Sequence, residues 1–260
     1  NYIRELEFYE NIDEKLKKYT VPTYACYKNA LQSSYLIFMK EIKGGIEFEK
    51  KYIYKALDVI SSFHKEYYGK KECCDIFKLN HYTDLDYKRS RRLLSYIFKK
   101  FDAENRNYFS SKGLEKIDDF LENIHIYRKS LPEHNTLTHN DFCQRNIFFL
   151  REELIIYDWE LACYQNPEHD LIEFMMFEAH KFEDDEVRKI VKYFKNSLFS
   201  AIDIDMKKEE YSRIIEFNIL EYIVNKLSVY RLADVSLRFD FMSVICKNAA
   251  RLLQMTEEGF

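Results

Sequence analysis

The spacing of apolar side chains predicts long helices over most of the chain. Between residues 48 and 68, five apolar side chains recur at the three- and four-residue intervals of one helix face: Tyr52, Ala56, Val59, Ile60 and Phe63. Similar patterns predict helices over residues 2–18, 84–104, 113–129, 170–181, 184–199, 209–230 and 236–255. Val21-Pro22 ends the first of these, because a proline inside a helix removes a hydrogen bond and clashes with the preceding turn.

Short β-rich runs interrupt this helical pattern in two places. One pair of runs, near residues 24–28 and 35–42, precedes Gly44-Gly45. The other pair, Ile147–Leu150 and Leu154–Tyr157, is separated by three charged residues, which predicts a β-hairpin. Only 5 glycines and 3 prolines among 260 residues leave little room for the turns of a many-stranded sheet. We therefore predict an α+β chain with a small strand-containing part and a larger helical body that includes one hairpin.

Charge and cysteine content narrow the class of protein. The formal net charge of -4 argues against nucleic-acid binding, which normally needs a basic face, and weakly against docking on an anionic membrane. No apolar run approaches the roughly 20 residues of a membrane span. The 6 cysteines have no metal-binding spacing, so we expect reduced thiols in a cytoplasmic protein. The pattern leaves the oligomeric state open.

Polar residues with a specific spacing flank the predicted hairpin. His139, Asp141 and Asn146 precede its first strand, and Asp158 follows its second strand. Because a hairpin returns the chain to its starting end, Asn146 and Asp158 should lie side by side, with Asp141 in the loop just before them. Three oxygen-bearing side chains are thus expected to converge at one end of a rigid apolar hairpin.

This cluster has the groups that phosphoryl transfer requires. The reaction depends on positioning, on a metal ion that neutralises phosphate charge, and on a residue that orients the nucleophile. Mg²⁺ prefers oxygen ligands, which Asn146 and Asp158 supply, and Asp141 can accept the proton of an incoming hydroxyl. His139, Asp141 and Asn146 also fill the H-x-D-x-x-x-x-N spacing of a kinase catalytic loop. We therefore assign His139 and Asp141 as catalytic candidates.

These motifs resemble the aminoglycoside phosphotransferase and choline kinase group of kinase-like enzymes. The likeness is carried by the His139-Asn140-Asp141 form of the loop and by Asp158-Trp159-Glu160. It continues in the run from residue 166 to 171, Asn-Pro-Glu-His-Asp-Leu. The resemblance implies that Asp141 is the catalytic base and that Asn146 and Asp158 bind the metal and nucleotide. It also implies that Asp170 is a structural anchor for the catalytic loop.

The resemblance extends more weakly to the upstream part of the chain. The strand near 35–42, followed by Gly44-Gly45, resembles the last strand of the small lobe and the hinge, where the backbone of Lys40, Glu41 and Ile42 would hold adenine. Glu5 resembles the small-lobe glutamate that pairs with the ATP-binding lysine, and Glu7 is the alternative. The implied architecture is a two-lobed protein-kinase-like fold with a boundary near residues 42–46. Residues 1–43 would form the N-terminal lobe and residues 44–260 a mostly helical C-terminal lobe. The family's glycine-rich loop and lysine precede the helix with which this sequence begins, so we expect the small lobe to be truncated here and those strands to lie upstream.

The leading hypothesis for function is therefore transfer of the γ-phosphate of ATP to a hydroxyl of a small molecule, with Mg²⁺ as cofactor and GTP as the other candidate donor. The resemblance implies an aminoglycoside, a choline- or ethanolamine-like compound, or a sugar as acceptor. Carboxylates near and after the site would favour a cationic acceptor. They are Glu160, Glu168, Glu173, Glu178, Glu216 and Glu221.

Other functions remain as alternatives. The first is a catalytically weak pseudokinase that serves as a nucleotide- or protein-binding module, a hypothesis motivated by the missing lysine segment. A metal-dependent hydrolase using His139 and Asp141 as ligands ranks last, because the 7 histidines are dispersed. A protein kinase is disfavoured because the chain has no Asp-Phe-Gly or Ala-Pro-Glu motif. Among nearby residues, we expect packing from Trp159, packing or a hydrogen bond from His64, and a loop position for His134.

Overall fold

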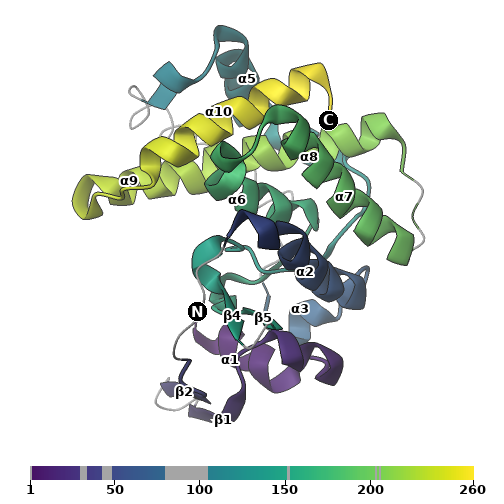
Figure 1. The fold of residues 1–260 in the computed structure, drawn as a ribbon, viewed down its shortest axis with the longest axis vertical. Coiled ribbons are helices and arrows are strands. Elements are labelled where there is room, and N and C mark those ends of the chain that lie inside the picture. Colours follow the sequence, from purple (N-terminus) through teal and green to yellow (C-terminus); the bar gives the residue numbers. More distant parts are fainter. Residues whose placement is uncertain are drawn as a thin grey trace. The chain divides into compact units, whose positions relative to one another are not determined.

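The structure is a computed structural model of the chain (Figure 1). It describes residues 2–29, 34–42, 49–79, 105–150, 153–202, 204 and 206–260. The chain divides into two compact units. The first contains Asn1–His81, His134–Leu171 and Tyr193–Asp203, and the second contains Tyr82–Glu133, Ile172–Lys192 and Ile204–Phe260. The predicted lobe boundary near residues 42–46 stays a prediction, since residues 43–48, with Gly44-Gly45, lie outside the described part of the chain.

The first unit combines helices with small antiparallel sheets. Its described helices and strands are α1 (Tyr2–Asn11), β1 (Thr23–Asn29), β2 (Ser34–Met39), α2 (Ile53–Tyr67), α3 (Cys73–Ile76), β3 (Thr136–Thr138), β4 (Ile147–Leu150), β5 (Glu153–Ile156) and β6 (Cys163–Gln165). Single 3-10 turns cover Glu14–Tyr19, Lys50–Tyr52, Gln144–Asn146 and Trp159–Leu161. The strands pair as β1–β2, β3–β6 and β4–β5.

The hairpin β4–β5 has the register that the sequence pattern predicts. Ile147 lies opposite Ile156, and Phe149 lies opposite Leu154. These side chains are buried, which fixes the register, because a slip by one residue would turn every one of them to the other face. Residues just outside the hairpin are therefore held at a defined place relative to each other.

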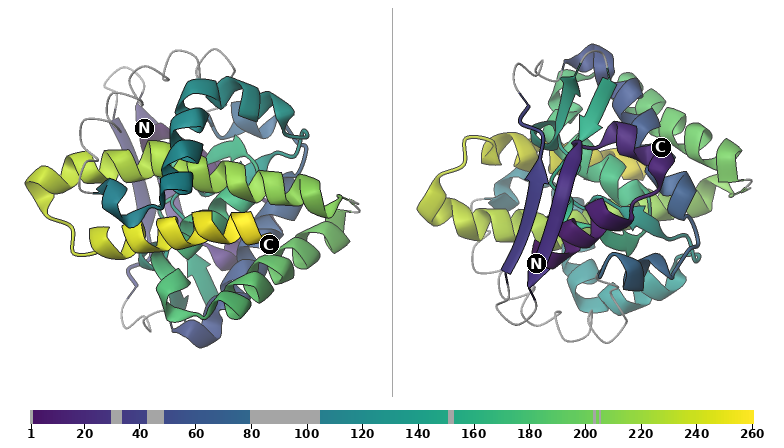
Figure 2. Two further views of the ribbon diagram at one scale, coloured as in Figure 1. Left: turned by 90° about the horizontal axis from the view of Figure 1, so that it is seen from above. Right: turned by 90° about the horizontal axis from the view of Figure 1, so that it is seen from below.

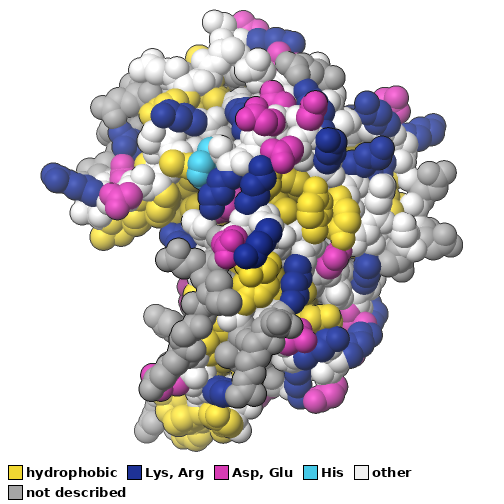
Figure 3. All heavy atoms as spheres, in the orientation of Figure 1, with side chains coloured by type: hydrophobic (Ala, Val, Ile, Leu, Met, Phe, Trp, Pro, Cys, Tyr) yellow, Lys and Arg dark blue, Asp and Glu magenta, His cyan; other side chains and the backbone are white. Residues whose placement is uncertain are grey.

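One face of the hairpin β1–β2 is half-buried and the other is exposed. Figure 2 shows both strands lying along α1, which they contact. Tyr27 and Leu36, which are directly opposite each other, are exposed, as is Phe38 opposite Ala25. Together with Tyr24 they form part of the hydrophobic surface visible at this hairpin in Figure 3.

An aromatic cluster forms the centre of the first unit. Phe8 of α1 stacks on Trp159 with ring centroids 4.0 Å apart, and Phe63 of α2 lies 4.8 Å from the same indole. Phe77, just after α3, contacts Phe8 at 5.8 Å. All four side chains are fully buried. The prediction that Trp159 has a packing role is confirmed.

The second unit is helical in its described residues. It contains α5 (Ser111–Ser130), α8 (Lys208–Tyr222), α9 (Ser228–Leu237) and α10 (Met242–Glu258), together with parts of α6 (Glu168–Glu178) and α7 (Asp184–Ile202). Helix α8 packs against both α5 and α10. Ser110 caps α5 by accepting the Gly113 N–H at 3.1 Å. Among the described helices, none has the length and apolar character needed to cross a membrane.

Most predicted elements are confirmed, with differences at their ends. The first predicted helix stops at Asn11, and a 3-10 turn follows in which Asp13 accepts the Lys15 N–H at 3.0 Å. The predicted start of the last helix at residue 236 is wrong: α9 runs to Leu237 and α10 begins at Met242, because Arg238 adopts the left-handed conformation with φ of 50°. The strands β3 and β6 were not predicted. The predicted helix 84–104 lies outside the described residues.

Candidate active site

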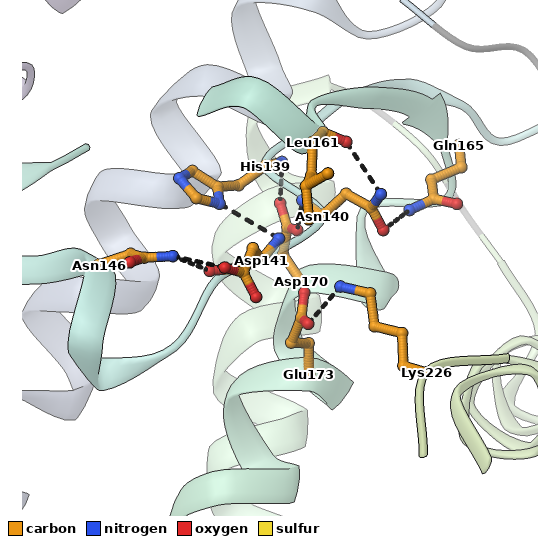
Figure 4. A network of polar contacts seen from close by, with 9 residues as sticks. All are labelled: His139, Asn140, Asp141, Asn146, Leu161, Gln165, Asp170, Glu173 and Lys226. Atoms are coloured by element: carbon orange, nitrogen blue, oxygen red, sulfur yellow. Dashed lines mark hydrogen bonds and ion pairs between the residues drawn. The ribbon is translucent and has the colours of Figure 1, made fainter. Parts of the chain in front are cut away.

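The catalytic-loop candidates converge where β3 leads into the hairpin (Figure 4). The Asn146 side-chain amide donates hydrogen bonds to the backbone carbonyl of Asp141 at 2.9 Å and to its carboxylate Oδ2 at 2.8 Å. The base of the hairpin is closed by the Tyr157 N–H, which donates to the Asn146 carbonyl at 3.1 Å. Because Asp158 directly follows Tyr157, the structure brings Asp141, Asn146 and Asp158 together, as the hairpin argument predicts.

Asp170, on the first turn of α6, binds the backbone of the loop that contains His139 and Asn140. Its Oδ2 accepts the His139 backbone N–H at 2.9 Å, and its Oδ1 accepts the Asn140 N–H at 2.9 Å. His64 of α2 adds a third hydrogen bond, from Nε2 to Oδ2 at 2.9 Å. Burial alone would raise the pKa of Asp170, but the bonds from His64 and His139 outweigh it and hold the pKa below its usual value. The predicted hydrogen bond of His64 is thus confirmed.

Both ring nitrogens of His139 form hydrogen bonds with backbone groups. Its Nε2 is 2.9 Å from the Tyr157 carbonyl, which can only accept, so the proton lies on Nε2. Its Nδ1 then accepts the Asp141 N–H at 3.2 Å. The imidazole is fully buried and packs edge-on against Trp159 at 4.6 Å. These contacts favour a positioning role for His139, whereas the sequence argument assigns it to the catalytic pair.

Two residues of the site adopt left-handed backbone conformations. Asn140 has φ of 59° and Asp158 has φ of 65°. Asn and Asp tolerate this region better than other non-glycine residues, and such strain persists only where surrounding contacts hold it. For Asn140 the contacts are its own amide, which donates to the Leu161 carbonyl at 2.9 Å, and Gln165, which donates to Asn140 Oδ1 at 3.3 Å. In the sequence, Asn140 was recognised only as part of the His139-Asn140-Asp141 motif, and Gln165 was not identified.

The donor set at Asp158 and Asn146 fits Mg²⁺. Burial raises the pKa of Asp158, and repulsion from the neighbouring Asp141 carboxylate adds to the shift, so a cation here would relieve the charge. The Asn146 amide nitrogen is committed to Asp141, which leaves the amide oxygen as its metal-binding atom. Within the described residues, no group of three or more His, Cys, Asp or Glu could hold a metal. One carboxylate and one amide oxygen match Mg²⁺, which commonly completes its shell with phosphates and water.

Helix α1 presents Glu5 to this turn. Burial, together with repulsion from the nearby Asp158 and Glu160 carboxylates, raises the pKa of Glu5 to about 7. Glu7, the alternative, instead forms an ion pair with Lys28 at 3.1 Å. Glu5 is therefore the residue of α1 that faces the site, and its pairing with a nucleotide-binding lysine stays a prediction.

The predicted adenine-binding segment follows β2. The Lys40 N–H donates to the Pro22 carbonyl at 2.8 Å, which continues the β1–β2 ladder beyond Met39. Lys40 and Glu41 have exposed side chains, and Ile42 is half-buried. Their contact with a nucleotide stays a prediction.

Most of the carboxylates proposed for a cationic acceptor already have partners within the protein. Glu173 pairs with Lys226, as Figure 4 shows; Glu178 pairs with Lys181 and Glu216 with Lys116. Glu168 binds His134 Nε2 at 3.0 Å. His134 lies in the loop before β3, as predicted, but it is buried, and its Nδ1 bonds to the Tyr68 hydroxyl at 2.6 Å. Glu221 accepts a hydrogen bond from the Asn225 side-chain amide at 3.2 Å. The charge argument for a cationic acceptor is therefore weaker than the sequence alone indicates.

Comparison with known proteins identifies the family to which the chain belongs. A profile of the phosphotransferase enzyme family matches residues 38–198, so the chain belongs to this family. A comparison with curated proteins gives no match.

Solved structures of this fold cover nearly the whole chain. A choline/ethanolamine kinase family protein from Mesorhizobium loti superposes with a TM-score of 0.59 at 14% identity, covering 99% of this chain and 79% of that one. A choline kinase from Streptococcus pneumoniae gives 0.58 at 13% identity, with 97% and 80% covered. A spectinomycin phosphotransferase, solved with ADP and spectinomycin, gives 0.59 at 14% identity, with 98% and 82% covered. These likenesses confirm the protein-kinase-like fold.

Proposed function

We propose that this protein transfers the γ-phosphate of ATP to a hydroxyl group of a small molecule. The observation that carries the proposal is the constellation of Asp141, Asn146 and Asp158 at the end of the β4–β5 hairpin, held by Asp170. Membership of the phosphotransferase family and the kinase-like fold support it.

Each residue has a distinct role in this proposal. Asp141 accepts the proton as the acceptor oxygen forms its bond to the γ-phosphorus and the bond to the β,γ-bridging oxygen breaks. Mg²⁺ held by Asn146 and Asp158 would neutralise charge on the donor phosphates. Asn146 also orients the base, because its amide binds the Asp141 carboxylate at 2.8 Å. His139 keeps the loop in register through its two backbone contacts and is placed here as a positioning residue.

Nucleotide complexes of proteins with a similar fold support the proposed donor. The spectinomycin phosphotransferase structure contains ADP, and an amicoumacin kinase of the same fold was solved with AMP-PNP. We therefore propose ATP as donor, with GTP as the competing candidate. Lys40, Glu41 and Ile42 would bind the base through their backbone, and Glu5 would pair with a cationic partner of the phosphates.

The acceptor is proposed as a hydroxyl-bearing small molecule. The proteins of similar fold are named for choline, ethanolamine, spectinomycin and amicoumacin. Because Glu173, Glu178 and Glu216 are paired with lysines, the carboxylates that remain to favour a cationic acceptor are few. Choline-like compounds, aminoglycosides and neutral sugars are therefore all tested as acceptors.

The test is ADP release from Mg·ATP with a panel of choline, ethanolamine, an aminoglycoside and neutral sugars. With the acceptor that gives turnover, Asp141→Asn should lower kcat by about 10²- to 10⁴-fold, since it removes the general base. Asp58→Asn serves as a matched control, because Asp58 is an exposed aspartate on α2 that binds Tyr193 and Ser197. Wild-type turnover in the Asp141 variant would contradict the assignment.

A further inference from the structure

Arg4 on α1 is buried, although none of the described carboxylates pairs with it. Its side chain is only 3% exposed. The guanidinium instead binds two backbone carbonyls: Nη1 donates to that of Glu160 at 2.7 Å, and Nε donates to that of Lys78 at 3.4 Å. Burying a charged guanidinium costs free energy unless its N–H groups are hydrogen-bonded. We therefore expect Arg4 to have a specific role in holding the two carbonyls that it binds.

The acceptor at Glu160 belongs to the turn that carries the proposed metal carboxylate. Trp159–Leu161 form the 3-10 turn that begins directly after Asp158. The carbonyl of Glu160 accepts the hydrogen bond from Arg4. Because Glu160 is only two residues after Asp158, Arg4 holds the turn that directly follows the carboxylate.

Phe8 adds a second contact from the same helix face. Arg4 and Phe8 are four residues apart, so they project from the same side of α1. Phe8 stacks on Trp159 with centroids 4.0 Å apart and planes 11° from parallel. Helix α1 thus holds both residues that follow Asp158, whose left-handed backbone has φ of 65° and ψ of 60° and needs such support.

We propose that Arg4 is a positioning residue for the metal site: by fixing the carbonyl of Glu160, it orients the Asp158 carboxylate toward a divalent cation. The inference rests on the proposed function, because it assumes a cation bound by Asn146 and Asp158. It adds a residue of α1 that lies outside the catalytic loop and the hairpin and is separated from Glu160 by 156 positions in the sequence.

The chain offers a matched control in Arg251. This arginine of α10 also binds two backbone carbonyls, those of Ala179 and Phe182, each at 2.8 Å, and in addition Asp184. All four residues belong to the second unit, whereas Asp141, Asn146 and Asp158 belong to the first. Replacing either arginine removes comparable bonds, but only Arg4 is connected to Asp158.

The experiment measures Mn²⁺ binding to the intact protein with saturating AMP-PNP, by the electron paramagnetic resonance signal of free Mn²⁺ after subtraction of the Mn²⁺ bound by AMP-PNP alone. Loss of a residue that supports a metal ligand typically weakens metal binding by about 10- to 100-fold, and this is the rise in Kd expected for Arg4→Met. Arg4→Lys should recover part of the affinity, because it keeps a donor at this position. Arg251→Met should lower the melting temperature and leave the Mn²⁺ Kd unchanged.

The outcomes separate this inference from the proposed function. If wild-type protein binds no Mn²⁺ with AMP-PNP, the proposed metal site fails, and the role of Arg4 fails with it. If wild type binds Mn²⁺ and folded Arg4→Met binds it equally well, only the role of Arg4 is overturned. Should Arg4→Met not fold, Arg4→Gln is judged by the same criterion, since its shorter neutral side chain cannot bridge both carbonyls.

Discussion

At the scale of single residues, Asp170 accepts three hydrogen bonds although its side chain is wholly buried. The donors come from His64 on α2 and from the backbone of His139 and Asn140. A carboxylate suits this place because it is acceptor-only and its two oxygens face separate donors. The loop that carries His139 and Asn140 is therefore fixed by charge-assisted hydrogen bonds that Asp170 accepts.

Asp170→Asn should destabilise the protein by about 3–5 kcal/mol at neutral pH, since an amide turns a donor toward the backbone N–H groups and leaves His64 without its anion. The folded-state pKa of Asp170 lies below its usual value. Its stabilisation is therefore fully present above the unfolded-state pKa, about 3.9, and is lost as pH falls through the lower folded-state pKa.

Urea unfolding of wild type and Asp170→Asn at about pH 7 and about pH 3 checks this prediction. The difference in unfolding free energy should shrink at the lower pH. Asp58→Asn, which alters an exposed carboxylate on α2, should show a small difference at both pH values. A difference for Asp170→Asn that is the same at both pH values would contradict the charged-anchor account.

The sequence predicted which site residues lie together where those residues are close to one another in the chain. Asp141, Asn146 and Asp158 meet because a short hairpin connects them, and the hairpin can be inferred from two short apolar runs separated by charged residues. The contacts of His64 with Asp170 and of Arg4 with Glu160 were not predictable, since 106 and 156 residues separate the partners. A local sequence pattern does not indicate contacts between residues so far apart in the chain.

At the scale of elements, α1 is attached to the site by packing as well as by polar contacts. Phe8 is fully buried and touches Tyr9, Phe63, Phe77 and Trp159. The helix was predictable from its apolar spacing, but its packing against Trp159 was not. By contrast, β3 and β6 were missed because each has three residues, too few for an alternating pattern.

Phe8→Ala should lower the free energy of unfolding by about 3–5 kcal/mol, because it leaves a cavity among rings that cannot easily close around it. Chemical denaturation followed by Trp159, the only tryptophan, reports directly on this cluster. Tyr24→Ala is the control: Tyr24 is an aromatic of the same unit that is 73% exposed, and its loss should cost less than about 0.5 kcal/mol. Equal costs for the two variants would contradict the packing role of Phe8.

At the scale of the whole molecule, the fold was predictable because the motif between residues 138 and 171 is specific to a family, and the profile of that family matches residues 38–198. The division into two compact units was not predictable in its details. Each unit gathers segments distant in sequence, such as Asn1–His81 with His134–Leu171. Helical periodicity predicts elements, but it does not indicate which of them pack together.

The central claim is that Asp158 helps to bind a metal-nucleotide complex, and thermal unfolding of the intact protein tests it most directly. Mg·ATP at about 100 times its Kd should stabilise the fold by about 2.7 kcal/mol, a rise in Tm of about 5–11 °C for a chain of this size. The account predicts that this rise needs magnesium, disappears in Asp158→Ala and persists in Asp58→Ala. A rise that is equal in Asp158→Ala, or no rise in wild type, would contradict it.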